Sequence, residues 1–345
     1  MFVTDLIAPR PDAPVKHVVT ALGSSSQEKG SNFVQKLWKD SPVPPPQIYD
    51  RYAAVYNDPN VDIVYIGTPH AVHKQNCLDA FAAGKSVLCE KPFTINERDA
   101  KEVIDAARSK GVFLMEAVWT RFFPLVQSLH EQLHINKAIG NIRRVFVDFG
   151  ITIPLSELPA DSRLKNPALG AGALLDIGIY SLTYASIILG AGRLGNEHPQ
   201  LKVTSTLDVV NGIDESNVVV LSYDEPKATA ICTSTMRYKS SEDFARIEGS
   251  EGTITIFGVA ASCPSGFRLS RTGTGETQRE EQVFKFDHPA GTAGFFYEAD
   301  AVAIDIVNGR KENGTMPLDE TLRMLRLMDS IRADGGLVYP QDQIR

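Results

Sequence analysis

Short apolar segments alternate with amphipathic stretches between residues 18 and 115, and this alternation constrains the fold more than any other feature of the sequence. Residues 62–66 and 86–89 are two of the apolar runs, and each is followed by a stretch whose apolar residues have helical spacing. Strands that alternate with helices in this way form a parallel sheet with helices on its faces. The pattern predicts a doubly wound α/β domain over about residues 1–120.

The second half of the chain has longer segments that alternate apolar with polar residues. Such alternation is typical of an antiparallel sheet with one covered face. An apolar helix is expected at residues 172–189, two further helices near residues 295–308 and 318–331, and a Thr/Gly-rich hairpin tip at residues 270–281. We therefore expect residues 121–345 to form an α/β domain with an open, mainly antiparallel sheet, with C-terminal helices that return to the first domain. The expected strands are residues 144–150, 216–223, 228–235, 244–248 and 253–257.

Composition narrows the class of protein. A chain of 345 residues with 43% hydrophobic residues can bury the cores of two domains. A net charge of -7 without any run of Lys or Arg argues against a nucleic-acid partner. We find no apolar stretch of 18 residues and no secretory signal, which predicts a cytoplasmic protein without a membrane partner. The four cysteines lack a metal-ligand spacing, so we expect reduced thiols and no metal site.

Glu90-Lys91-Pro92 ends the strand expected at residues 86–89, at the edge where open α/β sheets bind their ligands. A lysine at this edge can stabilise negative charge that develops on a substrate oxygen. Pro92 disfavours helical backbone angles at Lys91, so the lysine projects from an extended segment. A surface lysine before a proline turn explains the tripeptide alone equally well.

Asp176 and Tyr180 are four residues apart in the helix expected at residues 172–189, so they share one face. An aspartate in so apolar a helix needs a partner or a function, because an unpaired buried carboxylate is costly. In a structural interpretation, Asp176 caps a turn after Gly170-Ala171-Gly172 and the Tyr180 ring packs in the core. In a catalytic interpretation, Tyr180 donates and accepts a proton, and Lys91 lowers the pKa of its phenol.

Three other groups of residues are candidates for binding. Ser24-Ser25-Ser26 lies between a short strand and a helix start, where hydroxyl groups cap backbone amides. Thr68-Pro69-His70 and His73 follow another strand at the same sheet edge, where a histidine can titrate near neutral pH or serve as a hydrogen-bonded structural residue. Trp119 and Arg121 can wall and orient a polar ring substrate, and a core aromatic cluster is the alternative.

Three motifs together resemble the glucose-fructose oxidoreductase/inositol dehydrogenase (GFO/IDH/MocA) family, in its branch of dihydrodiol and NADP-dependent D-xylose dehydrogenases. They are Glu90-Lys91-Pro92, the run of residues 116–121 and the run of residues 172–180. The resemblance extends from about residue 2 to beyond residue 328 and includes Tyr297-Glu298-Ala299-Asp300.

The resemblance implies an oxidoreductase that uses NADP, acts on a polyhydroxylated or cyclic small molecule and forms a homodimer through its sheet. Lys91 and Tyr180 would lie at the hydride-transfer site, and Asp176 would orient substrate hydroxyl groups. Residues 68–73 and Glu90 would lie along the nicotinamide end of the cofactor. Ser24, Ser25 and Ser26 would lie near the adenosine ribose or its phosphate.

One departure from the family pattern affects the cofactor. Relatives begin with a strand and a glycine-rich turn that offers backbone amides to the pyrophosphate, and this sequence begins at the helix that follows them. The absent strand would lie between the strands at residues 17–23 and 62–66, so we expect a gap or an unusual pairing there. Three explanations are open. In the first, the start of the sequence is misassigned and the protein is an ordinary dehydrogenase. In the second, the pocket of Lys91, Asp176 and Tyr180 serves a cofactor-independent isomerase, cyclase or lyase. In the third, the protein is a non-catalytic small-molecule sensor.

Overall fold

The computed structural model describes residues 1–39, 41–190, 201–225, 227–271 and 281–343. The chain divides into two compact units. The first consists of residues 1–94, 98–119 and 288–318, and the second of residues 95–97, 120–287 and 319–345. Most of the hairpin tip expected at residues 270–281 lies outside the described residues.

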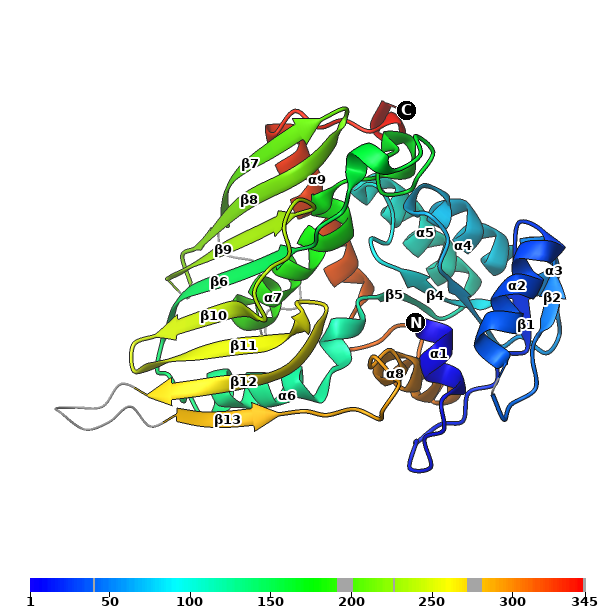
Figure 1. Cartoon of the computed structure of the whole chain (residues 1–345), viewed down its shortest axis with the longest axis horizontal. Coiled ribbons are helices and arrows are strands. Elements are labelled where there is room, and N and C mark those ends of the chain that lie inside the picture. The colour runs from blue at the N-terminus through cyan, green and yellow to red at the C-terminus, as the bar shows by residue number, and fades with distance from the viewer. Residues whose placement is uncertain (40, 191–200, 226, 272–280, 344–345) are drawn as a thin grey trace. The chain divides into compact units, whose positions relative to one another are not determined.

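The first unit contains five strands that pair in parallel but form two separate sheets (Figure 1). No described strand joins β1 to β3, so the sheet has the break that the sequence predicts between residues 17–23 and 62–66. The predicted parallel α/β class is confirmed, and the sheet is incomplete at this position. One sheet consists of β1 (Ala21–Gly23) and β2 (Gln47–Tyr49), and the other of β3 (Ile63–Ile66), β4 (Ser86–Glu90) and β5 (Leu114–Ala117).

Two of the helices of the first unit bury an apolar stripe in its core. Cys77 and Phe81 in α4, and Val103 and Ile104 in α5, are at most 1% exposed. Such burial of a helical stripe supplies most of a helix's stability in a folded domain. The helices of the first unit are α1 (Phe2–Ile7), α2 (Gln27–Trp38), α3 (Tyr52–Tyr56), α4 (His73–Ala82), α5 (Glu97–Lys110) and α8 (Phe296–Val307).

Helix α8 is fixed to the N-terminal segment by two acidic side chains. Asp5 accepts hydrogen bonds from the backbone amides of residues 293, 294 and 295 at distances of 2.8 to 3.1 Å. Asp300 accepts from Arg10 and contacts His17, at 2.7 and 2.6 Å. Asp5 therefore satisfies the amides of the turn that leads into α8 and ties α1 to this turn.

The second unit is built on one sheet of eight strands in the order β13-β12-β11-β10-β6-β9-β8-β7. Every neighbouring pair is antiparallel except β6 and β9, as the predicted mainly antiparallel class requires. The strands are β6 (Ile142–Gly150), β7 (Lys202–Val210), β8 (Ile213–Tyr223), β9 (Ala228–Thr235), β10 (Asp243–Gly249), β11 (Gly252–Ala260), β12 (Cys263–Arg271) and β13 (Glu281–Lys285). The sequence analysis located β6, β8, β9, β10 and β11 and missed β7, β12 and β13.

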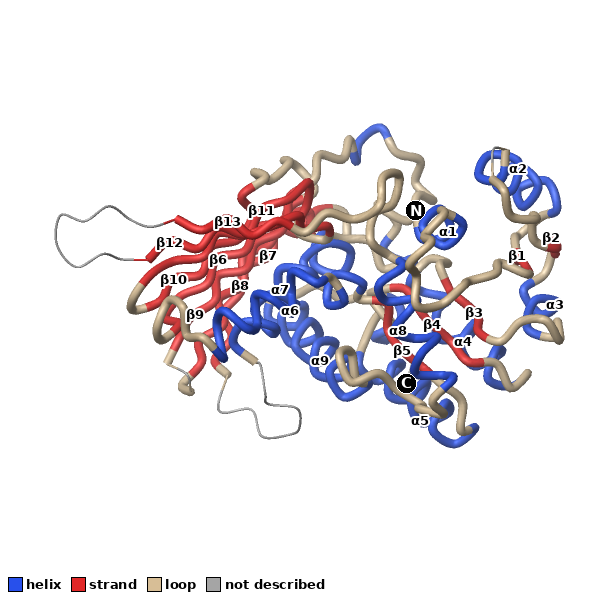
Figure 2. Tube along the Cα trace, turned by 90° about the horizontal axis from the view of Figure 1, so that it is seen from below, coloured by secondary structure: helices blue, strands red, loops and turns tan. Residues whose placement is uncertain are grey.

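Helices lie on one side of this sheet (Figure 2). The helices are α6 (Pro124–His130), α7 (Ile179–Leu189) and α9 (Leu318–Asp334), and short α10 (Pro340–Gln343) follows near the C-terminus. A five-residue π-helical turn, Leu174–Gly178, leads directly into α7. All eleven residues of α7 are buried, so this helix forms the centre of the core.

One expectation about apolar stretches is wrong. Pro167–Leu189 is long and apolar enough to cross a membrane by length and composition alone. However, 94% of the apolar window is buried inside the folded chain, which is typical of the core helix of a globular domain. The stretch is therefore accounted for by packing.

The cysteines and acidic residues of the described part of the chain form no metal-ligand cluster. None of the four cysteines is paired in a disulfide, and Cys77, Cys89 and Cys232 are buried. Burial raises the pKa of the Cys232 thiol to about 12, so this thiol stays protonated and packs as a small apolar group.

Candidate active site

Lys91 directly follows β4 in the first unit, as predicted, and its peptide bond to Pro92 is cis. The neighbouring Glu90 carboxylate accepts hydrogen bonds from the Tyr65 hydroxyl and, at 3.2 Å, from the Lys91 amide. The Phe2 ring stacks on the Tyr65 ring with 3.7 Å between ring centroids. Residues from α1, β3 and β4 thus fix the backbone from which Lys91 projects.

His73 is fully buried and connects two loops of the first unit. Its Nε2 lies 2.8 Å from the Thr68 carbonyl oxygen, and its Nδ1 lies 3.1 Å from the Pro92 carbonyl oxygen. Burial lowers the pKa of His73 below its usual value, which favours the neutral ring. Both ring nitrogens face backbone carbonyls, so this geometry supports the structural alternative for His73 rather than direct contact with a substrate. The residue brings Thr68-Pro69-His70 and Lys91-Pro92 to one edge of the sheet.

The three serines after β1 have different local roles. The Ser26 hydroxyl accepts a hydrogen bond from the Lys29 amide at 3.2 Å and caps α2, as the sequence predicts for this segment. Ser25 is exposed, and its hydroxyl lies 3.2 Å from the Lys29 ammonium group. A hydroxyl beside an exposed ammonium group is suited to contact an anionic group. The sequence alone did not indicate that Lys29 lies beside these serines.

Glu298 in α8 is a buried acid that the sequence analysis did not single out. It is 0% exposed, and neither of its carboxylate oxygens has a hydrogen-bond partner among the described residues. Burial, and to a smaller extent the charge of Glu90, raises the pKa of Glu298 well above its usual value. The carboxyl group is therefore harder to ionise in the folded chain than in water. Tyr297-Glu298-Ala299-Asp300 was part of the family resemblance, but nothing in the tetrapeptide signals this burial.

In the second unit, Asp176 lies in the π-helical turn and Tyr180 lies one turn later in α7. Asp176 is 8% exposed, and its Oδ1 lies 3.5 Å from the guanidinium group of Arg163. The Tyr180 ring packs edge-on against Phe149 with 5.6 Å between centroids. The pair thus combines a paired carboxylate and a phenol on one rigid element of the core, and Arg163 is a partner that sequence spacing could not identify.

The two candidate residues after β5 are both engaged by protein groups. Trp119, in the first unit, is 3% exposed and stacks on Phe295 at 3.9 Å. Arg121, in the second unit, donates to the Glu320 carboxylate and, at 3.2 Å, to Ser186 of α7. These contacts support the alternative of a core aromatic cluster for Trp119 and give Arg121 a structural charge partner.

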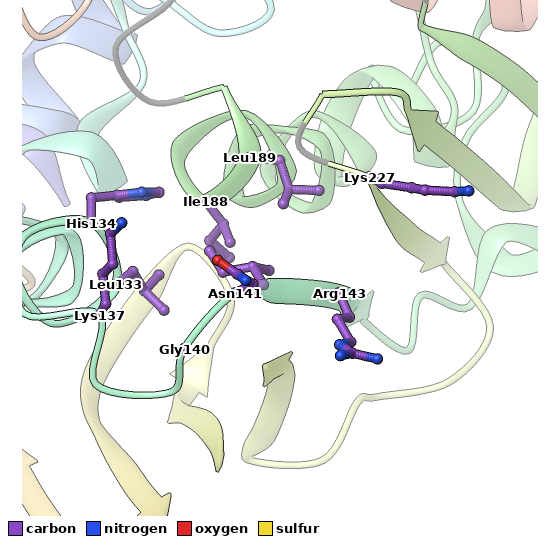
Figure 3. Close-up of a pocket in the computed structure, with 10 residues that line it drawn as sticks. Leu133, His134, Lys137, Gly140, Asn141, Arg143, Ile188, Leu189 and Lys227 are labelled. Carbon is purple, nitrogen blue, oxygen red and sulfur yellow. The ribbon is translucent and has the colours of Figure 1, made fainter. Parts of the chain in front are cut away.

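A cavity of about 480 Å³ opens elsewhere in the second unit (Figure 3). None of the described residues predicted for the site lines it. Four of its lining residues, His134, Lys137, Arg143 and Lys227, are basic or titratable, and Leu133, Ile188 and Leu189 supply apolar walls. The cavity is therefore separate from the residues that carry the predicted chemistry.

Comparisons with known proteins identify the family. Residues 2–118 match the oxidoreductase family with an NAD-binding Rossmann fold, and residues 129–255 match the GFO/IDH/MocA C-terminal domain. D-xylose 1-dehydrogenase (NADP(+)) from Hypocrea jecorina is 34% identical over 95% of this chain and 86% of its own length. The chain belongs to the GFO/IDH/MocA oxidoreductase family.

Two other similarities support the same assignment. The trans-1,2-dihydrobenzene-1,2-diol dehydrogenase of Danio rerio is 33% identical over 95% of this chain and 91% of its own length. The crystal structure of aldose-aldose oxidoreductase from Caulobacter crescentus complexed with glycerol superposes with a TM-score of 0.75 at 26% identity, and covers 92% of this chain and 89% of that one. The predicted family and its oxidoreductase class are thereby confirmed.

Proposed function

We propose that this protein is an NADP-dependent dehydrogenase of polyhydroxylated or cyclic small molecules, of the D-xylose or dihydrodiol type. The observation that carries this proposal is the similarity, along 95% of the chain, to a D-xylose 1-dehydrogenase (NADP(+)). The similarity to a dihydrodiol dehydrogenase at nearly the same identity widens the substrate class from aldoses to cyclic diols.

The chemistry of the candidate residues suits the oxidation of a hydroxyl group. The Lys91 ammonium group can stabilise the negative charge that develops on the reacting oxygen. The Tyr180 phenol can take the proton of that hydroxyl, and the Asp176 carboxylate can accept hydrogen bonds from neighbouring hydroxyl groups. When bound, the nicotinamide supplies the acceptor for the hydride.

The described residues fit part of this cofactor. Ser24, Ser25 and Ser26 follow β1, Thr68-Pro69-His70 follow β3, and Glu90 ends β4, so all three groups lie at carboxyl ends of parallel strands, where such folds bind nucleotides. Among the described residues no strand joins β1 to β3, where the loop that binds the pyrophosphate would follow a strand. We therefore assign the two ends of the cofactor to these residues and leave the pyrophosphate unassigned.

The broken sheet favours a second candidate function. An enzyme that uses the Lys91, Asp176 and Tyr180 side chains for acid–base chemistry without a nucleotide needs no pyrophosphate cradle. An isomerase, cyclase or lyase would satisfy this requirement, and a non-catalytic sensor would need only the binding groups. We rank both below the dehydrogenase.

A homodimer formed through the outer face of the eight-stranded sheet belongs to the same proposal. Phe146, Ile231 and Val220 form a cross-strand row on the face opposite the helices, and Arg144 and Arg246 lie over the Phe146 ring at 4.8 and 4.7 Å. Partly exposed apolar groups of this kind form isologous interfaces. Sedimentation as a monomer at micromolar concentration would contradict the dimer. We also expect the protein in the cytoplasm.

The test of the activity is direct. Purified protein is incubated with NADP⁺ and D-xylose, or with a trans-dihydrodiol, and reduction of the nicotinamide is followed by absorbance. Lys91→Met serves as the inactive control, because it keeps the side-chain length and removes the charge. Reduction by the wild type alone supports the dehydrogenase. Turnover of a sugar or cyclic diol without nucleotide, detected by NMR of the substrate, would instead establish the acid–base alternative.

A further inference from the structure

The turn that precedes Asp176 and Tyr180 is built from glycine in conformations that other residues rarely adopt. Gly170 and Gly172 have φ angles of +76° and +138°. The π-helical turn Leu174–Gly178, which carries Asp176, begins two residues after Gly172, and the helix that carries Tyr180 follows it without interruption. Any group that fixes residues 171–174 therefore sets the position of both candidate residues.

Asp214, at the start of β8, holds this turn from one side. Its Oδ2 accepts hydrogen bonds from the Leu174 amide at 2.8 Å and from the Asn217 side-chain amide at 2.9 Å. Its Oδ1 has no hydrogen-bond partner among the described residues and lies against Gly172, where an added Cβ would approach it to 2.4 Å. The side chain of Asp214 is thus in close contact with the backbone of the turn, and Asp214 is 0% exposed.

Tyr339 holds the same turn from the C-terminal segment. Its hydroxyl donates a hydrogen bond to the carbonyl oxygen of Ala171, and an added Cβ on Gly172 would approach it to 2.9 Å. The Tyr339 amide in turn donates to Asp342 at 2.9 Å, and Arg332 in α9 pairs with the same carboxylate. Two fully buried side chains from distant parts of the sequence therefore clamp one short turn.

We propose that Asp214 is a positioning residue of the dehydrogenase: by accepting the Leu174 amide and excluding any side chain at Gly172, it fixes the turn from which Asp176 and Tyr180 project. The inference rests on the proposed function, because it assigns Asp214 its effect on turnover through those two residues. A neutral Asn or Ser satisfies a helix-start amide about as well as Asp does. Burying a carboxylate only to accept one amide is costly. The stronger, charge-assisted hydrogen bond of Asp214 explains why an aspartate holds a turn that must not move.

The surroundings of Asp214 make its charge variable near neutral pH. Burial raises the pKa of Asp214 to about 7, although the Asn217 and Leu174 hydrogen bonds and the Arg332 charge oppose this. The charged and titratable groups that face it are Arg332 of α9 and Tyr339 of the C-terminal segment, with Asp342 bonded to both. Turnover should therefore depend on pH near 7 through this group, in addition to any dependence from Tyr180.

The experiment compares Asp214→Asn with Asp214→Leu. Both side chains are close in size to aspartate, but only asparagine keeps an oxygen that can accept the Leu174 amide. We expect Asp214→Leu to lower kcat about 10²-fold, the loss typical of a 1 Å misplacement of reacting groups, with KM for NADP⁺ within about twofold of wild type. Asp214→Asn should keep kcat within about tenfold and lose the pH dependence near 7. Asp305→Asn, which alters a buried acid in α8 of the first unit, is the matched control and should leave kcat unchanged.

Hydrogen exchange of residues 170–180 provides a readout that does not need activity. Exchange at the Leu174 amide should be faster in Asp214→Leu by roughly tenfold or more and near wild type in Asp214→Asn. Equal kcat in wild type and Asp214→Leu, or equal losses in the two variants, would overturn the positioning role.

If Asp214→Leu does not fold, Tyr339→Phe replaces it. Exchange at residues 171–174 should then rise and kcat should fall, and no change in either quantity would overturn the proposal. A wild-type protein that lacks dehydrogenase activity would contradict the proposed function, whereas exchange would still decide whether Asp214 holds the turn.

Discussion

Two buried glutamates, one in each unit, have opposite electrostatic surroundings. Glu298, in the first unit, is 0% exposed and has no hydrogen-bond partner among the described residues, and burial raises its pKa. Burial would also raise the pKa of Glu320, in the second unit, but Arg121 and Arg323 lower it to about 2. Two arginines thus compensate the buried Glu320 carboxylate, whereas burial disfavours the charged form of Glu298.

The two units also differ in the continuity of their sheets. The second unit has eight strands paired without interruption, and the described strands of the first form two sheets. Residues that a sheet would normally cover are only partly buried beside the break, as all three residues of β1 show. The first unit, which holds Glu298, is thus also the unit whose described strands form two separate sheets.

The largest expected effect concerns the nucleotide. We expect residues 1–345 to bind NADPH weakly, and a chimera that carries a relative's first strand and glycine-rich turn before residue 1 to bind it at least about 100-fold more tightly. Each charge-assisted hydrogen bond to the pyrophosphate contributes roughly 1.5–3 kcal/mol, and about 1.4 kcal/mol is a factor of ten in affinity. Titration of NADPH fluorescence with both proteins measures the difference.

The same titration can contradict the expectation of weak NADPH binding. Micromolar or tighter binding by residues 1–345 would show that the break between β1 and β3 does not weaken the nucleotide site, and would remove the main support for a cofactor-independent enzyme. Absence of binding by both proteins would favour that enzyme or the sensor. Lys91→Met in each background is a suitable control, since it alters the catalytic end of the site and leaves β1 and β3 unchanged.

Replacing each buried glutamate by glutamine should change stability with opposite signs. We expect Glu320→Gln to lower the free energy of unfolding at pH 7 by about 3–5 kcal/mol, because Arg121 and Arg323 would lose their buried partner. Glu298→Gln should raise it by roughly 1–3 kcal/mol, because an acid with a raised pKa is easier to ionise in the unfolded chain and each pH unit contributes about 1.4 kcal/mol. Urea unfolding of the three proteins measures both changes.

The pH dependence of these differences distinguishes the two mechanisms. The folded pKa of Glu298 is raised, so its penalty to the wild type is absent below the unfolded pKa near 4.5 and grows as pH rises above it. The gain from Glu298→Gln should therefore shrink between pH 7 and pH 4. The folded pKa of Glu320 is lowered, so its contribution is present above pH 4.5 and is lost as pH falls toward about 2. A destabilised Glu298→Gln at pH 7 would mean that the carboxylate has a partner in solution.

The sequence predicted the fold class and the candidate residues better than it predicted their partners. Runs of apolar residues, at positions 218–221 and 230–232, marked β8 and β9, whereas β7, whose residues are all at least partly exposed, was missed. The sequence could assign Lys91 to a strand end and Asp176 and Tyr180 to one helical segment, because strand ends and helix spacing are local properties. Arg163 and Asp214 could not be recognised in this way, since each reaches its partner through the tertiary fold from 13 to 40 residues away. The sequence also could not show whether His73 is a buried residue bonded to backbone carbonyls, as observed, or a histidine that titrates near neutral pH.

A smaller effect is expected at Tyr180 in the second unit, whose sheet is complete. We expect Tyr180→Phe to lower the turnover rate about 10²-fold if the phenol transfers a proton. The melting temperature should change little, because the ring keeps its edge-on contact with Phe149. NADPH binding, measured by fluorescence, should be unaffected. An unchanged rate would return Tyr180 to a packing role and leave Lys91 and Asp176 without a proton acceptor.

The smallest expected effects concern Ser25 and Ser26 of the first unit, one of which should affect nucleotide binding and the other stability. Ser26 caps α2, so Ser26→Ala should lower the free energy of unfolding by about 1 kcal/mol, the usual cost of losing a cap. Ser25 is exposed, and its hydroxyl lies beside the Lys29 ammonium group. We expect Ser25→Ala to leave stability unchanged and to weaken binding of NADPH relative to NADH by roughly tenfold, because one hydrogen bond to a charged group contributes roughly 1.5–3 kcal/mol and about 1.4 kcal/mol is a factor of ten. Thermal unfolding and competitive titration of the two nucleotides measure the two effects, ideally in the chimera with the stronger site. If Ser25→Ala weakens both nucleotides equally, or neither, this end of β1 does not contact the adenosine phosphate, and the assignment of Ser24, Ser25 and Ser26 to the cofactor fails even where the dehydrogenase itself is active.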